Sequence, residues 1–270
     1  MIAEDRRVAT SRQAGSGRCL AASAGLFYTP VVEIRGASAL VTGAGRGIGR
    51  ATALALARAG ARVTALSRTA AELDSLLAEI RGTGGQARAY PGDIRDRAVC
   101  EGAVQTAVEA HGRLQILVNN AGVAAHAPLA ETTDEDWDRT LATNLTAIFR
   151  LTRAALPHLV QGGGHVFMIS SLAGKNAIAG LSAYCASKAA LDHLAACLML
   201  EVRHQGVMVT TIAPGSVDTG FGAAGGVRRS DTAWMLTAQD IAAAILDLLR
   251  TRDGAHLSRV EMRPLRPPKH

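Results

Sequence analysis

The chain has 270 residues, of which 48% are hydrophobic and 19% charged, and it carries a formal net charge of +6. This composition is typical of a globular protein with an ample core and excludes disorder as the main state. No apolar run approaches the roughly 18 residues that a membrane-spanning helix needs, so we expect no membrane partner.

The basic excess lies at the two ends of the chain. Residues 1–36 carry a balance of +2 and residues 250–270 a balance of +4, whereas residues 37–249 hold 18 basic and 18 acidic side chains. A protein that binds nucleic acid through phosphates normally carries its basic excess on the folded face. The distribution therefore argues against a nucleic-acid partner.

Residues 1–34 lack periodicity and are rich in Ala, Ser, Gly and Arg, so we expect a disordered N-terminal extension. The segment fits a secretory signal poorly. An organelle transit peptide stays open as an alternative, although Glu4 and Asp5 argue against it. Residues 35–263 are expected to form one domain, followed by a basic tail at 264–270. The four cysteines and eight histidines show no metal-ligand spacing, which favours reduced thiols, a cytoplasmic location and no metal site.

The first folded pattern is a strand, a glycine-rich turn and a helix. Residues 38–42 read as a buried strand, Gly43-Ala44-Gly45-Arg46-Gly47-Ile48-Gly49 as the turn, and residues 50–59 as an Ala- and Leu-rich helix. Glycines allow close approach to the backbone, while the free N–H groups and the positive end of the helix dipole favour an anionic phosphate. Its place between strand and helix strengthens a motif that is weak by itself.

The next expected strand, 61–66, ends at Ser67-Arg68. In dinucleotide-binding folds an acid at this position binds the ribose 2′-hydroxyl, whereas a nearby arginine accommodates a 2′-phosphate. The acid is missing, and Ser67, Arg68 and Arg46 are available instead. This pattern favours NADP(H) over NAD(H), unless both arginines are ordinary solvated surface charges.

Helices and strands then alternate to the end of the domain. Helices are expected at 70–81, 96–110, 134–160, 182–204 and 238–250, and strands at 87–90, 114–118, 165–170, 207–213 and 256–262. Alternation of this kind predicts an α/β fold of three layers, with a doubly wound parallel sheet of about seven strands. Ligands of such sheets bind at the carboxyl ends of the strands.

A tyrosine and a lysine follow the strand at 165–170 within Tyr184-Cys185-Ala186-Ser187-Lys188. Their i, i+4 spacing puts the hydroxyl and the ammonium on one face of a helix. A cation near a tyrosine favours the phenolate, so we expect Lys188 to lower the pKa of Tyr184 and to make it an acid–base group near neutral pH. Ser171 precedes the tyrosine by 13 residues.

Together these motifs resemble the short-chain dehydrogenase/reductase family over residues 37 to about 220. The matches are Thr42-Gly43-x-x-x-Gly47-Ile48-Gly49, Asn119-Asn120-Ala121-Gly122, Asn144, Ile169-Ser170-Ser171, Tyr184-x-x-x-Lys188 and Pro214-Gly215. The resemblance implies a Rossmann fold and hydride transfer between a nicotinamide and a carbonyl or secondary alcohol. It implies that Tyr184 donates the proton, Ser171 binds the substrate oxygen and Lys188 binds the nicotinamide ribose, with Asn144 holding a water that links Lys188 to solvent.

The resemblance also implies the cofactor contacts and an assembly into a homodimer or homotetramer. Carried over residue by residue, the contacts are Gly43, Arg46, Gly47, Ile48 and Gly49 for the pyrophosphate, Ser67 and Arg68 for the 2′-phosphate, Asp93 and Ile94 for the adenine, Asn120 and Gly122 for the adenosine ribose, and Pro214, Val217 and Thr219 for the carboxamide, besides Tyr184 and Lys188. Asn119 and Asn120 remain candidates for simply joining neighbouring strands. Cys185 is interpreted as a packing residue rather than a nucleophile.

The substrate is left open. The ending Arg259-Val260-Glu261-Met262 lacks the Gly-Gly strand of 3-oxoacyl-carrier-protein reductase-like members and looks closer to members that act on small hydroxy acids. Apolar candidates for the substrate pocket are Leu172, Ala173, Ile178, Trp234 and Met235, which suit a hydrophobic ketone or core packing equally well. The run Gly222 to Gly226 suggests a mobile segment beside the site.

Two alternatives to this oxidoreductase are weighed. A non-catalytic NADP-binding regulator on the same fold is the first, because a fold never proves catalysis. The presence of all four residues Asn144, Ser171, Tyr184 and Lys188 argues against it. An epimerase or dehydratase is the weaker second, because those relatives usually carry a longer substrate domain.

Overall fold

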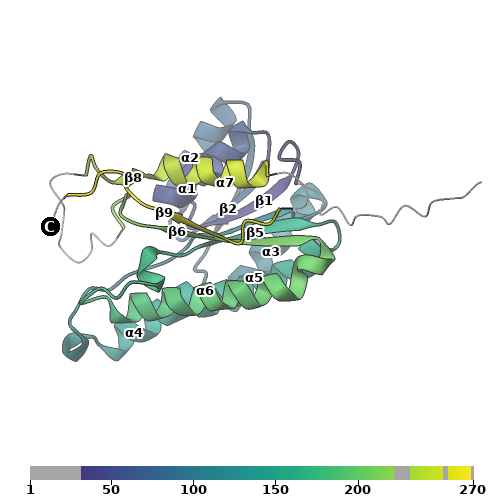
Figure 1. The fold of residues 1–270 in the computed structure, drawn as a ribbon. Coiled ribbons are helices and arrows are strands. Elements are labelled where there is room, and N and C mark those ends of the chain that lie inside the picture. The colour runs from purple at the N-terminus through teal and green to yellow at the C-terminus, as the bar shows by residue number, and fades with distance from the viewer. Residues whose placement is uncertain (1–31, 222–231, 252–254, 269–270) are drawn as a thin grey trace, which may run out of the picture.

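Seven parallel strands form the central sheet of the computed structural model, which describes residues 32–221, 232–251 and 255–268 (Figure 1). In chain order they are β1 (Ser38–Thr42), β2 (Arg62–Ser67), β3 (Gln86–Pro91), β4 (Ile116–Asn119), β5 (Gly164–Ile169), β6 (Val207–Pro214) and β9 (Arg259–Met262). They lie in the order β3-β2-β1-β4-β5-β6-β9, so the order reverses between β1 and β4. This is the strand order of a doubly wound Rossmann sheet, and it confirms the predicted fold class.

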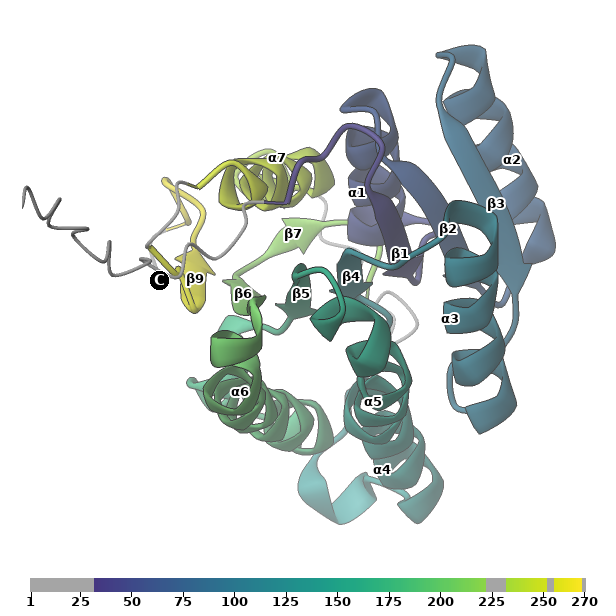
Figure 2. The ribbon, with the colours of Figure 1, turned by 90° about the vertical axis from the view of Figure 1, so that its right-hand side faces the viewer.

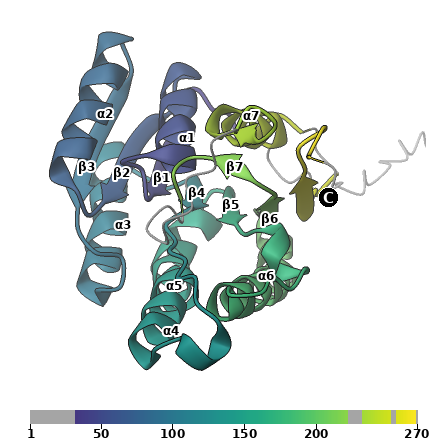
Figure 3. The same ribbon diagram turned by 90° about the vertical axis from the view of Figure 1, so that its left-hand side faces the viewer.

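Helices cover both faces of the sheet, as Figures 2 and 3 show. One face carries α1 (Gly47–Arg58), α2 (Ala70–Gly82) and α7 (Ala238–Leu249). The other carries α3 (Arg97–His111), α5 (Ala147–Val160) and α6 (Ser182–Val202), with α4 (Asp134–Leu141) packed beside α6. No helix within the described residues combines the length and the apolar character needed to cross a membrane.

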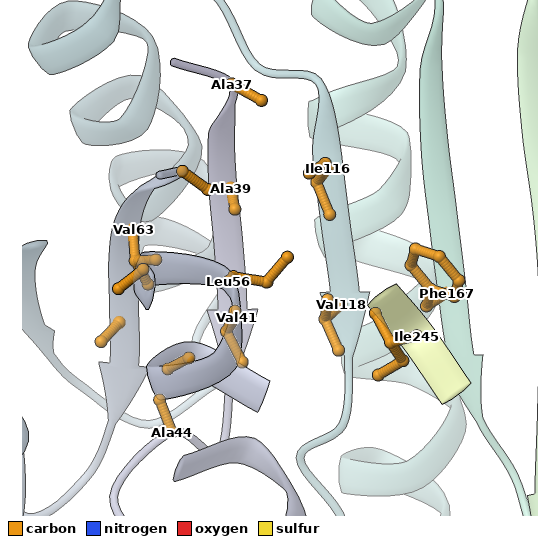
Figure 4. Packing of buried hydrophobic residues seen from close by; sticks show 14 of the residues in the cluster. Ala37, Ala39, Val41, Ala44, Leu56, Val63, Ile116, Val118, Phe167 and Ile245 are labelled. Carbon is orange, nitrogen blue, oxygen red and sulfur yellow. The ribbon is translucent and has the colours of Figure 1, made fainter. Parts of the chain in front are cut away.

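Alternating side chains of each strand supply the two cores. In β1, Ala39 and Val41 face the core under α1 and α7, whereas Leu40 faces the core under α3 and α5. Figure 4 shows the first core, where Leu56 of α1 lies beside Val41 and Ile245 of α7 lies between Val118 and Phe167. Because successive strand residues point to opposite faces, a strand covered on both sides must be apolar throughout. This explains the unbroken apolar runs in the sequence.

Several element boundaries differ from the predicted ones. The helix after the glycine turn begins at Gly47, inside the glycine run, and the helical region predicted at 134–160 is interrupted by a π-helical turn, η2 (Ala142–Thr146). The last strand starts at Arg259 instead of residue 256. The reason is that the imidazole of His256 contacts the backbone N and O of Val209, so a side chain takes the place of strand pairing there.

The N-terminal boundary of the domain and the segment after β6 also differ from the prediction. Val32 and Ile34, which we placed in the N-terminal extension, are buried in the core with 5% and 8% exposure. Residues 1–31 and the Gly222–Gly226 run lie outside the described residues. Two short strands that the sequence did not predict, β7 (Val217–Asp218) and β8 (Leu236–Thr237), pair with each other next to the end of β6.

Candidate active site

A cleft of about 1150 Å³ lies at the carboxyl ends of the strands. Most of the residues singled out from the sequence line it, namely Gly43, Arg46, Gly47, Ile48, Ser67, Arg68, Asp93, Ile94, Asn120, Gly122, Ser171, Tyr184, Lys188, Pro214, Val217 and Thr219. Gly49 and Asn144 do not line it and lie behind its wall, where they contact lining residues. The sheet topology thus gathers into one cleft residues that are up to 176 positions apart in the chain.

The glycine turn leaves no room for side chains. Gly43 and Gly47 have φ values of +64° and +54°, which side chains other than hydrogen rarely tolerate. A Cβ on Gly49 would lie 2.2 Å from the Gly43 carbonyl oxygen. Arg46, the N-cap of α1, is extended and makes no capping hydrogen bond with its side chain, so the first N–H groups of the helix face the cleft uncapped. This geometry fits the pyrophosphate of a dinucleotide.

The end of β2 carries the residues assigned to the 2′-phosphate, Ser67 and Arg68, and they share the wall of the cleft with Arg46. An acid that the sequence pattern missed, Glu72 in the first turn of α2, lies there too. A Cβ on Gly45 would be 2.2 Å from Glu72 Oε2 and 2.9 Å from Ser67 Oγ. The acid that many dinucleotide-binding folds carry at this strand end is absent from β2, but the Glu72 carboxylate reaches the same region from α2.

Asp93 follows β3 at the outer end of the cleft. Its carboxylate accepts hydrogen bonds from the backbone and side chain of Arg95, of which the shortest is 2.7 Å, from Arg95 Nη2. The hydrogen bond from the Arg95 side chain lowers the pKa of Asp93, so the group is ionised at neutral pH. Ile94 beside it is 5% exposed and forms an apolar part of the wall.

Thr42 joins the ends of β1 and β4 at the point where the strand order reverses. Its Oγ1 accepts hydrogen bonds from the backbone N–H groups of Asn120 and Ala121, both at 3.0 Å. Asn120 in turn donates from Nδ2 to the Thr42 carbonyl at 2.9 Å. Asn120 therefore joins the neighbouring strands, as the alternative interpretation held, and also lines the cleft.

Asn144 is fully buried in the π-helical turn η2. Its Oδ1 accepts from Val123 N at 2.8 Å, and its Nδ2 donates to Val123 O at 2.9 Å and to Ser187 Oγ at 3.0 Å. Both amide protons are thus engaged, and the side chain anchors the loop after β4 to α6. π-helical turns inside α-helices are frequent at functional sites.

Ser171, Tyr184 and Lys188 meet at the floor of the cleft. Ser171 follows β5 and caps a short turn, η3 (Leu172–Gly174), by accepting from Ala173 N at 3.1 Å. The Ser171 hydroxyl lies near enough to that of Tyr184 to act on its pKa, which it lowers. Lys188 Nζ lies 5.7 Å from the centre of the Tyr184 ring and donates to the Ile169 carbonyl at 2.8 Å.

The expected lowering of the tyrosine pKa is wrong for this structure. Burial raises the pKa of Tyr184 to about 12, and the Ser171 hydroxyl acts in the opposite direction without offsetting it. Burial also lowers the pKa of Lys188 to about 8, an effect that Asp192 opposes. The spacing rule counted the attraction between the two groups but not the loss of solvation when Lys188 is buried and Tyr184 is packed into the floor of the cleft.

The substrate end of the cleft is mostly apolar. Ile178 and Met235 line it, as does Phe221, whose ring centre lies 5.9 Å from that of Tyr184. Leu172, Ala173 and Trp234, also proposed from the sequence, are not among the lining residues. Further polar lining residues that the sequence pattern missed are Thr69, Arg95, His126, Arg139, Thr143, Ser216, Asp218 and Thr232. No strand-end pattern could have found His126, Arg139 and Thr143, because the loop and helix after β4 bring them in.

Within the described ranges, no group of three or more His, Cys, Asp or Glu side chains is placed to hold a metal ion. Cys100, Cys185 and Cys197 are free thiols. Cys185, next to Tyr184, is half-buried, and its Sγ lies 3.9 Å from the Asn176 carbonyl oxygen.

Comparison with known proteins decides the family. Residues 37–226 match the family model described as short chain dehydrogenase. The chain belongs to this family. This short-chain dehydrogenase is 39% identical over 195 residues to D-erythrulose reductase from Gallus gallus, covering 72% of this chain and 76% of that protein. The predicted family and its oxidoreductase class are thereby confirmed.

Two further comparisons place the short-chain dehydrogenase among its relatives. It is 40% identical over 194 residues to the probable oxidoreductase EphD of Mycobacterium tuberculosis, covering 71% of this chain but only a third of that protein's length. A metagenomic short-chain oxidoreductase solved in complex with NADP matches 85% of this chain and 98% of its own, with 37% identity and a TM-score of 0.75.

Proposed function

We propose that this protein is an NADP(H)-dependent oxidoreductase that interconverts a carbonyl compound and a secondary alcohol, with Tyr184 as its proton donor. The observation that carries the proposal is the meeting of the Ser171 and Tyr184 hydroxyls in one cleft beside the buried ammonium of Lys188. Two hydroxyl donors side by side are what a carbonyl oxygen requires when negative charge develops on it.

When bound, a reduced nicotinamide supplies a hydride to the carbonyl carbon. Tyr184 gives its proton to the oxygen as negative charge develops there, and Ser171 donates a hydrogen bond to the same oxygen. The ammonium of Lys188, 5.7 Å from the centre of the Tyr184 ring, favours the phenolate that remains on Tyr184 after the transfer. In the alcohol-oxidising direction the phenolate takes the proton back.

The preference for NADP(H) rests on Arg46 and Arg68, which line the cleft at the end of β2 together with Ser67. A guanidinium pairs well with a phosphate because its donors match the phosphate oxygens in geometry and charge. Glu72 opposes this preference, so we propose NADP(H) as the better of two usable cofactors. The solved relative that carries NADP supports the same assignment.

The substrate we propose is a ketone with at least one apolar substituent. Ile178 and Phe221 line the cleft near Tyr184 with 46% and 48% of their surfaces exposed, and such apolar surface stands to gain from contact with an apolar ligand. The homodimer or homotetramer and the cytoplasmic location remain predictions from the sequence.

The test is turnover of the purified protein with NADPH and NADH against a panel of ketones of increasing alkyl length. We expect oxidation of NADPH with apolar ketones, and a loss of at least about a thousandfold in kcat for Tyr184→Phe. Tyr90→Phe is the matched control, because Tyr90 lies against Gly102 of α3 and outside the cleft. Binding of NADPH without turnover of any ketone would favour the regulatory alternative instead.

A further inference from the structure

A third ionisable residue follows Tyr184 and Lys188 along α6 at the same spacing. Asp192 lies four residues after Lys188, so all three side chains project from one face of the helix. The Asp192 side chain is only 11% exposed, and its Oδ2 forms an ion pair with Arg259 Nη1 at 2.8 Å. Its Oδ1 is buried with no hydrogen-bond partner in the described part of the chain.

Arg259 reaches α6 from the last strand of the sheet. β9 pairs with β6, whose end lines the cleft at Pro214, and Arg259 lies opposite Thr211 in that pairing. A buried carboxylate is costly unless a cation neutralises it. The ion pair therefore fixes the C-terminal strand to the turn of α6 that follows Lys188.

The same carboxylate touches the turn that carries Ser171. A Cβ on Gly174 would lie 2.6 Å from Asp192 Oδ2 and 3.1 Å from the Lys188 carbonyl oxygen, so η3 packs directly on this turn of α6. Ser171 is the N-cap of η3, and Lys175, which follows η3, forms an ion pair with Glu261 of β9. Two ion pairs of β9 thus support the residues around the site: Arg259 holds Asp192 of α6, and Glu261 holds Lys175 at the end of η3.

We propose that Asp192, held in place by Arg259, is a positioning residue that supports the ammonium of Lys188 electrostatically and seats the turn that carries Ser171. The inference rests on the proposed function, because Lys188 and Ser171 act in that reaction. The last strand thereby contributes to the site through Asp192, although neither Arg259 nor Asp192 lines the cleft.

Asp192 is the charge that acts on the pKa of Lys188, and the other groups on the elements around Lys188 are as follows. The Ile169 carbonyl of β5 and the Asn144 amide of η2 are uncharged, and Arg139 of α4, which lines the same cleft, is paired with Asp136 at 2.5 Å. The other titratable groups on these elements are Tyr184, Cys185, His193, Cys197 and Glu201 of α6, Asp134, Glu135 and Asp138 of α4, His165 of β5, Lys175 after η3, and Arg259 and Glu261 of β9. Burial lowers the pKa of Lys188 to about 8, and the negative charge of Asp192 is the effect that opposes it.

The composition of the chain allows a direct test, because it contains only three lysines, at positions 175, 188 and 269. In protein labelled with ¹³Cε-lysine, NMR resolves their titrations separately, and Lys175→Arg and Lys269→Arg assign the signals. We expect Asp192→Asn to lower the pKa of Lys188 by about one unit, since an opposite charge nearby is lost. The alkaline limb of the kcat/KM profile should move to lower pH by the same amount.

Glu261→Gln is the matched control. It breaks the ion pairs of Glu261 with Lys175, Arg263 and Arg259 Nε but leaves the ion pair between Asp192 and Arg259 Nη1 in place. We expect the Lys188 titration to stay as in the parent protein. An equal shift in Glu261→Gln and Asp192→Asn would overturn the inference, because it would reflect general loosening of the strand.

Arg259→Gln keeps the inference falsifiable if Asp192→Asn does not fold. It leaves the charge of Asp192 uncompensated, so the pKa of Lys188 should rise, and an unchanged or lower value would overturn the inference. The NMR titration needs no turnover. If Asp192→Asn leaves the Lys188 titration unchanged while Tyr184→Phe abolishes ketone reduction, only the positioning role is refuted. If Asp192→Asn shifts the titration but the parent protein reduces no ketone, only the proposed function is refuted.

Discussion

Replacing Gly49 by alanine should damage the glycine turn, by an amount that the structure allows us to estimate. The new Cβ would lie 2.2 Å from the Gly43 carbonyl oxygen, 2.6 Å from Asn120 Nδ2 and 2.7 Å from the Gly43 carbonyl carbon. Non-bonded heavy atoms prefer separations of about 3.5–4.0 Å, so the methyl overlaps backbone on one side and a strand-joining amide on the other. Overpacking of this kind costs about 1–3 kcal/mol, and we expect a loss near the upper end because the Gly43 backbone, at φ +64°, has little freedom to move.

Urea unfolding monitored by circular dichroism measures this loss, and NADPH fluorescence measures binding. Gly82→Ala is the matched control, since Gly82 ends α2 and a Cβ there would meet nothing within 4 Å. That change should be neutral or stabilise the protein by up to about 1 kcal/mol, because alanine favours the helix. We also expect Gly49→Ala to weaken NADPH binding by about tenfold or more, as the turn that would hold the pyrophosphate shifts. Equal stability and equal binding in the two variants would refute the close packing of the turn.

Two further predictions concern a buried neutral histidine and the two arginines of the cleft. Burial lowers the pKa of His165 to about 3, so the unfolded state takes up a proton below about pH 6.5 and stability falls as the pH drops from there toward 3. His165→Gln should lose about 2 kcal/mol less stability than the parent protein between pH 7 and 4.5, measured by urea unfolding; equal losses would contradict it. Arg46→Ala combined with Arg68→Ala should raise the KM for NADPH by about tenfold or more while changing that for NADH by less than about twofold. Equal effects on both cofactors would remove the argument for a 2′-phosphate.

The sheet and most of the cleft could be predicted from the sequence because both follow from local patterns. Apolar runs such as 38–42 and 165–170, each preceding a helical segment, are sufficient to predict parallel strands covered on two faces. Residues directly after those strands must then share one edge of the sheet. This is why Gly43, Asn120 and Ser171 could be placed in a common site.

The features that could not be predicted depend on contacts between distant parts of the chain. The π-helical turn around Asn144 depends on hydrogen bonds to Val123, and the late start of β9 depends on the contacts of His256 with Val209. Glu72 escaped notice because the pattern looked for an acid on the strand rather than on the next helix. The pKa of Tyr184 was misjudged because its burial depends on the whole fold.

The transfer of deuterium from a cofactor labelled at nicotinamide C4 tests the central claim most directly. NADPH carrying deuterium at the transferred position is incubated with a ketone that the protein accepts, and the alcohol is analysed by mass spectrometry. We predict one deuterium on the carbinol carbon, none when the label occupies the other face of C4, and no labelled alcohol with Tyr184→Phe. An alcohol without deuterium from either labelled cofactor would contradict hydride transfer in this cleft.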